Sequence, residues 1–136
     1  MKSKMIMPQE VFRVIVDDCR YKNHNGHLCV EWTLRILDGD WTAKTLTKYN
    51  NLNGPAAAAL FREELRLLDV PFTTPAEFEN APSRLIGKQC YVRYGMNDSG
   101  YFQTEIDFER TSGVHIKEKI KETWRRYYEQ KENNNL

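Results

Sequence analysis

The chain has 136 residues, a length that allows one domain with a sizeable core and leaves little for a second. Its 20 basic and 19 acidic residues give a net charge of +1, so any nucleic-acid surface requires local segregation of charge. The three cysteines, Cys19, Cys29 and Cys90, have no paired spacing. They argue against a disulfide framework and predict buried free thiols in a reducing compartment. No apolar run is long enough for a signal peptide or a membrane span, so we expect a cytoplasmic protein with no membrane partner.

Three strand-like runs lead the chain, over roughly residues 11–22, 27–37 and 41–50. The second is the clearest, because alternate positions are apolar, as in a half-buried strand: Leu28, Val30, Trp32, Leu34 and Ile36. Asn25-Gly26 predicts a tight turn between the first two runs, and Asp38-Gly39-Asp40 predicts another before the third. The first run needs a bulge to bring Cys19 and Tyr21 back to its apolar face. Together the three runs predict an antiparallel meander.

A helix is expected over about residues 55–69. Alanine and leucine are strong helix formers, and Pro55 suits a first helical turn. The residues Leu60, Phe61, Leu65 and Leu68 form one apolar stripe, with Glu63-Glu64 assigned to the solvated side. Val70-Pro71 should end the helix, and a short helical turn is expected after Thr74-Pro75.

Two more strand-like runs, 88–94 and 101–109, follow the helix and indicate a closing hairpin. From Val114 the period becomes helical, and this last segment holds six basic and four acidic residues, so the basic surplus of the chain lies here. Its apolar positions recur at three- and four-residue steps: Ile116, Ile120, Trp124, Tyr127 and Tyr128.

These patterns predict a mainly β fold, a five-stranded OB-fold-like antiparallel barrel with a helix between strands 3 and 4 and an extra C-terminal helix. The expected segments are an N-terminal extension over residues 1–8, the barrel over 9–113, a basic amphipathic helix over 114–130 and a polar tail over 131–136.

The middle of the chain also resembles a known family. The run from Trp32 to Gly39 (WTLRILDG), then Trp41 and the run from Tyr49 to Leu52 (YNNL), are similar to motifs of small bacteriophage OB-fold single-stranded DNA-binding proteins of replication and recombination modules. The resemblance covers about residues 10–110 and implies non-catalytic, sequence-tolerant binding of single-stranded DNA in a phage-infected or prophage-bearing host. It also implies partners among phage replication and recombination proteins. Many such proteins end in an acidic tail that recruits partners, whereas this chain ends in a basic helix and an Asn-rich tip.

Binding of single strands needs aromatic rings on which bases stack and basic groups that follow the phosphates. In OB folds the binding surface runs across strands 2 and 3 and the loops that join strands 1 to 2 and 4 to 5. Trp32, Tyr94 and Phe102 fall on apolar faces and are expected in the core. The predicted DNA-binding residues are Tyr21, Lys22, Arg35, Trp41, Lys44, Lys48, Tyr49, Arg93 and Tyr101.

Three alternatives remain open. His24, His27, Asp38 and Asp40 could serve a metal-dependent nuclease, but they lie at opposite ends of one predicted strand, so no metal or other cofactor site is predicted. The C-terminal helix could make the chain an interaction module or accessory factor, by forming a homodimer or docking on another phage protein; it could equally fold back on its own barrel or lie along DNA. An OB barrel can also bind an oligosaccharide or a peptide.

Overall fold

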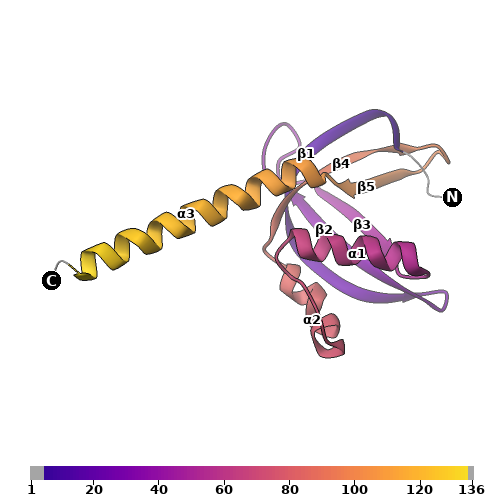
Figure 1. Cartoon of the computed structure of the whole chain (residues 1–136). Coiled ribbons are helices and arrows are strands. Elements are labelled where there is room, and N and C mark those ends of the chain that lie inside the picture. The colour runs from indigo at the N-terminus through magenta and orange to yellow at the C-terminus, as the bar shows by residue number, and fades with distance from the viewer. Residues whose placement is uncertain (1–4, 135–136) are drawn as a thin grey trace.

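The computed structural model describes residues 5–134, with side chains from residue 10 to residue 131. Five strands form one antiparallel sheet in the order β3-β2-β1-β4-β5, accompanied by three helices. The strands are β1 (Met5–His24), β2 (His27–Ile36), β3 (Thr45–Asn51), β4 (Gln89–Asn97) and β5 (Phe102–Ile106). The helices are α1 (Pro55–Leu67), α2 (Pro75–Leu85) and α3 (Phe108–Asn134). Figure 1 shows α1 and α2 beside the curved sheet, and α3 running away from this body.

The meander β1-β2-β3 is confirmed. β1 pairs with β2 from Val14↔Ile36 to His24↔His27, and the turn residues Asn25 and Gly26 have φ angles of 52° and 80°. Both values are positive, as a two-residue hairpin turn requires. The predicted bulge is also present, as a shift of register between Val16 and Asp18, and it returns the next apolar side chains to the core face.

Helices contribute as much of the chain as strands, so the fold is mixed α/β rather than mainly β. Along residues 5–134 the edge strands β3 and β5 share no backbone ladder, and the sheet is therefore not closed into the expected barrel. The two edges nevertheless touch, because Thr104 Oγ1 on β5 donates a hydrogen bond to the Thr47 carbonyl on β3 at 3.1 Å.

Several element boundaries differ from the expected ones. Residues 5–8, expected in an extension, belong to β1, and Met5 and Ile6 pair with Asn97 and Met96 of β4. The second helix is a full helix, α2, with Thr74 as its N-cap, because the Thr74 hydroxyl accepts a hydrogen bond from the Glu77 backbone N–H. α3 begins at Phe108 rather than Val114, since the Asp107 carboxylate accepts a hydrogen bond from the Arg110 N–H and caps the helix. α3 also includes residues 131–134 of the expected tail; residues 1–4 and 135–136 lie outside the described residues.

The core lies between the inner face of the sheet and the helices α1 and α2. Trp32 at its centre packs edge-on against Phe61 of α1, with ring centroids 6.3 Å apart. Trp32 is fully buried as expected, whereas Tyr94 is half-buried and Phe102 is 61% exposed, so the expectation that Phe102 is core is wrong. No helix within residues 5–134 has an apolar stretch long enough to span a bilayer.

Candidate nucleic-acid interface

Exposed aromatic side chains lie on one strand and two connections of the sheet. Tyr49 points outward from β3 and is 63% exposed. Trp41, 53% exposed, lies in the connection from β2 to β3, and Tyr101, 73% exposed, lies in the turn from β4 to β5. These are the three predicted residues whose rings are open enough to stack on a base.

Two basic residues, Arg20 and Lys22, lie on the outer face of β1, two strands away from Tyr49 on the same side of the sheet. The register places Arg20 opposite Glu31 and Glu31 opposite Tyr49, so the three residues form one row across three strands. Arg20 Nη2 lies 3.3 Å from Glu31 Oε1, and Lys22 Nζ lies 3.1 Å from Glu31 Oε2. The hydrogen bond from Lys22, together with the charges of Lys22 and Arg20, lowers the pKa of the Glu31 carboxyl. One carboxylate therefore holds two cations on the sheet face that carries the exposed ring.

Arg35 and Lys44 lie at the other end of the β2–β3 ribbon, near Trp41. Arg35 Nε is 2.9 Å from Asp17 Oδ2, and both side chains are partly exposed. The backbone N–H of Lys44 donates to the Trp41 carbonyl, which closes a turn that keeps the two residues close in the chain. Among the described side chains Lys44 has no ion pair, so its ammonium is open to an anion.

Arg93 is separated from this face by the strand order, because β1 and β2 lie between β4 and β3. Its guanidinium Nη2 is 3.7 Å from Glu105 Oε2 on β5. In the same hairpin, Tyr94 and Phe102 stack with ring centroids 5.3 Å apart and planes at 9°. Phe102 was missed as a candidate because its alternation with Thr104 and Ile106 predicts burial, whereas it lies at the exposed end of that inner face.

Lys48 does not belong to the predicted interface, and this assignment was wrong. Its side chain is 4% exposed, and Nζ lies 2.8 Å from Oε2 of Glu64, which is 1% exposed. Glu64 also accepts a hydrogen bond from Asn50 Nδ2 at 2.6 Å, and Asn50 Oδ1 accepts one from Trp32 Nε1 at 2.7 Å. Glu64, expected on the solvated side of its helix, thus belongs to a buried polar network with Lys48. The alternation with Leu46 was the available signal, since Leu46, Lys48 and Asn50 share the inner face of β3.

Tyr21 is also turned away from the exposed face. Its ring packs against Phe78 of α2 with centroids 5.1 Å apart, and its hydroxyl donates a hydrogen bond to the Phe78 carbonyl. Burial, together with the nearby Cys19 and Glu79, raises the pKa of the Tyr21 phenol above its usual value. The ring therefore fastens α2 to β1 and is not open for stacking.

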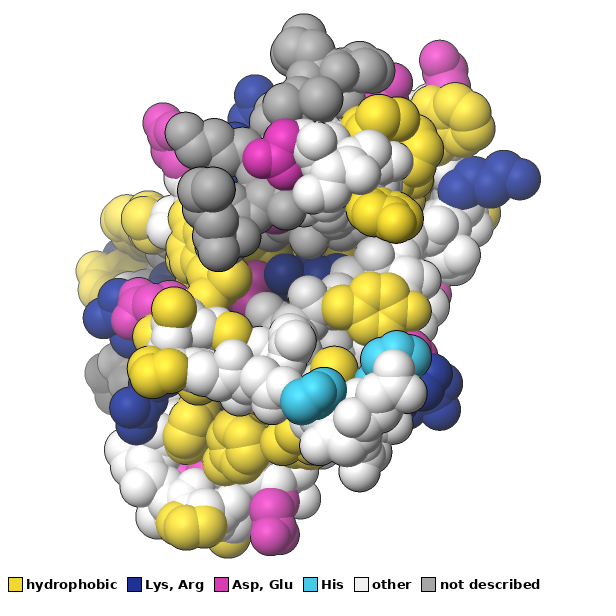
Figure 2. Space-filling model, turned by 90° about the vertical axis from the view of Figure 1, so that its right-hand side faces the viewer, with side chains coloured by type: hydrophobic (Ala, Val, Ile, Leu, Met, Phe, Trp, Pro, Cys, Tyr) yellow, Lys and Arg dark blue, Asp and Glu magenta, His cyan; other side chains and the backbone are white. Residues whose placement is uncertain are grey.

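The predicted set thus divides into three groups. Lys22 lies on the same face of the sheet as Tyr49, two strands away. Arg35, Lys44 and Trp41 lie at the far end of the β2–β3 ribbon, about 13 Å from Tyr49 for four residues of strand. Arg93 and Tyr101 lie on the β4–β5 hairpin. Lys48 and Tyr21 point inward, where Lys48 pairs with Glu64 and Tyr21 contacts Phe78. Figure 2 shows basic, acidic and apolar side chains interspersed on the face it presents, without a broad field of one sign.

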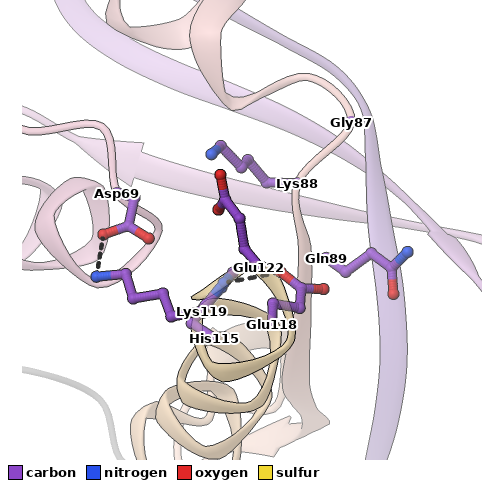
Figure 3. A pocket seen from close by; sticks show the side chains of 8 residues that line it. All are labelled: Asp69, Gly87, Lys88, Gln89, His115, Glu118, Lys119 and Glu122. Carbon is purple, nitrogen blue, oxygen red and sulfur yellow. Dashed lines mark ion pairs between the residues drawn. The ribbon is translucent and has the colours of Figure 1, made fainter. Parts of the chain in front are cut away.

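Two hollows, of about 250 and 420 Å³, lie at the base of α3 and away from the exposed aromatic rings. Figure 3 shows the first, where Lys119 pairs with Asp69 at 3.1 Å and His115 Nδ1 lies 3.6 Å from a Glu118 carboxylate oxygen. Both hollows are open and carry charges of both signs. Among the described residues, no three His, Cys, Asp or Glu side chains are placed to share a metal ion.

Comparison with known proteins adds no assignment. The sequence matches no protein-family profile, and no curated protein is significantly similar to it.

Proposed function

We propose that the chain is a non-catalytic, sequence-tolerant single-stranded DNA-binding protein with a partly open OB-like barrel. The strand order β3-β2-β1-β4-β5, with a helix between β3 and β4 and a side-chain contact between the two edges, supports this type of barrel. The observation that carries the proposal is Tyr49, an aromatic ring 63% exposed on the outer face of β3, with Arg20 and Lys22 two strands away on the same face of the sheet. In OB folds the outer surface of strands 2 and 3 binds oligonucleotides.

Binding would combine base stacking with an exchange of ion pairs. Bases stack on Tyr49, Trp41 and Tyr101, and phosphates compete with carboxylates for the neighbouring cations. Because Glu31 holds Arg20 and Lys22, and Asp17 holds Arg35, a phosphate must displace a carboxylate to contact any of these three cations, whereas Lys44 is open to a phosphate directly. The affinity should therefore be modest and should fall steeply with salt, as expected when counterions are released.

A fluorescence titration with oligothymidine and with duplex DNA, each at two salt concentrations, tests the proposal. We expect tighter binding of the single strand. Tyr49→Ala should weaken it by roughly 5- to 150-fold, because stacking contributes about 1–3 kcal/mol per base. Tyr49→Phe is the matched control, since it keeps the ring and removes only the hydroxyl, and it should bind like the original chain. Preference for the duplex, or equal binding by Tyr49→Ala, would contradict the proposal.

The same titration distinguishes the other ligands of this fold. A neutral oligosaccharide can stack on Tyr49, but its binding would show little salt dependence because no counterions are released. If the chain binds an oligosaccharide and does not bind oligothymidine, the OB-like fold remains supported and the proposed DNA binding is wrong.

A second candidate, an interaction module within a phage replication or recombination complex, is favoured by α3. Among the described side chains, this helix presents six large apolar ones to solvent along its length.

A further inference from the structure

The C-terminal helix α3 carries an exposed apolar stripe where it leaves the body of the protein (Figure 1). Its members are between 52% and 58% exposed: Ile116, Ile120, Trp124, Tyr127 and Tyr128. The three aromatic rings contact one another, with Trp124 and Tyr128 stacked at a centroid distance of 6.0 Å. The stripe is thus a continuous surface rather than a scatter of single residues.

Only Ile116 of the stripe borders the body, where it lines the second hollow with residues of α1; the other members lie farther along the helix. The base of α3 is attached through Thr111, which is buried and exchanges hydrogen bonds with the Tyr91 backbone, and through His115, which is 8% exposed. The Lys119–Asp69 pair adds a contact to the segment after α1. At 3.6 residues per turn, Ile120 lies about 140° around the helix from His115 and about 100° from Lys119, on the side open to solvent. Folding the helix back on its own body therefore does not cover the stripe.

The area of the stripe is that of a small stable interface. Large apolar side chains bury on the order of 200 Å² each, so five of them at about half exposure offer roughly 500 Å² per copy. Two copies would remove about 1,000 Å² from water, the area at which specific protein interfaces begin.

The order of residues along the stripe is self-complementary. In an antiparallel pair with Ile120 facing its own copy, Ile116 faces Trp124, and Gly113 faces Tyr127 of the other copy. Large side chains then lie opposite smaller ones. A Cβ at Gly113 would have nothing within 4 Å, so this position offers open space for a ring. Glycine inside a helix costs stability relative to alanine, and the facing tyrosine gives it a packing role.

The charges at the two ends of the stripe match in the same register. Glu109 lies at the start of the stripe and Lys131 at its end; both are exposed, and neither has an ion pair among the described side chains. With Ile120 on the two-fold axis, Glu109 of each copy faces Lys131 of the other. A parallel pair would instead place Glu109 against Glu109, Lys131 against Lys131, and the aromatic rings against themselves. We propose that α3 pairs with α3 of a second copy in an antiparallel, two-fold symmetric dimer centred on Ile120.

Sedimentation equilibrium of the full chain without DNA tests the dimer independently of the proposed function. We expect a dimer that dissociates on dilution. Ile120→Glu should give a monomer at all accessible concentrations, because it places two carboxylates together on the two-fold axis. Arg125→Gln is the matched control: it lowers the charge by the same amount on the opposite side of the helix, and it should leave the dimer intact. Far-UV circular dichroism of each variant verifies that the helix is retained.

A charge exchange tests the direction of the two helices. Glu109→Lys and Lys131→Glu should each weaken dimerisation by about tenfold, since either one creates two like-charge contacts across the axis. The double variant should restore the original dissociation constant. A chain that stays monomeric overturns the proposal, whether or not oligothymidine quenches its tryptophan fluorescence. A dimer that Ile120→Glu dissociates but the double variant does not restore overturns the antiparallel register.

Discussion

The buried pair Lys48–Glu64 gives the sharpest prediction about stability. Removing one member of a buried ion pair leaves the other charge without compensation, which costs about 3–5 kcal/mol of unfolding free energy. Lys48→Met retains most of the aliphatic stem beside Trp32, whose ring centroid lies 5.7 Å from Lys48 Nζ, and removes only the charge. Glu64→Gln keeps an oxygen that can accept the hydrogen bond from Asn50. Each single variant should therefore lose about 3–5 kcal/mol.

The double variant should be more stable than either single one, because neither charge remains buried alone. Urea unfolding at a fixed protein concentration, followed by far-UV circular dichroism and tryptophan fluorescence, measures all four free energies. The surface pair Arg126–Glu122 is a matched control, since its 2.7 Å separation is almost the same but its side chains are 70% and 49% exposed. Arg126→Met and Glu122→Gln should each change stability by about 0.5 kcal/mol or less. If the costs of the Lys48 and Glu64 substitutions simply add in the double variant, the two charges do not stabilise each other.

Three further predictions concern the outer face and the core. Glu31→Gln should tighten oligothymidine binding about threefold at low salt. It should also steepen the slope of log K against log salt concentration by about 0.7 for each basic side chain that becomes free to contact a phosphate. Weaker binding would show that the carboxylate does not compete with phosphate. Of the cysteines, only Cys29 should react with a thiol reagent in the native state, because burial raises the pKa of Cys19 and Cys90 to about 12; mass spectrometry showing more than one label would contradict this. Tyr21→Phe should lower the unfolding free energy by about 1 kcal/mol through loss of the hydrogen bond to α2, and an unchanged urea midpoint would refute that role.

Local patterns predicted those parts of the fold that local rules control. The alternation around Trp32, the Asn25-Gly26 turn and the bulge before Cys19 all lie where expected, because each depends on neighbouring residues. The start of α3 was placed too late, since Phe108 continues the alternation of β5 while Asp107 acts as a helix cap. Both residue types fit either element, and only the tertiary contacts decide between them.

The candidate site was harder to predict than the fold. Exposure of Trp41, Tyr49 and Tyr101 agrees with the proposed stacking surface, but Lys48 was assigned to it because it is a basic residue next to Tyr49 on a predicted binding strand. Its burial depends on Glu64, which lies on a different element and reaches the same point of the core only after folding. Contacts between elements distant in sequence leave no local pattern.

The length of β1 has a consequence for how the chain folds. Val14 pairs with Ile36 on one side and with Cys90 on the other, so a single strand joins the two halves of the sheet. Its pairing with β2 closes a short loop through a tight turn, whereas its pairing with β4 requires a much longer segment to be ordered first. Loop closure of this kind slows folding more than it affects stability. We therefore expect the β1–β2 hairpin to form early, and docking of β4 onto β1 to set the overall folding rate.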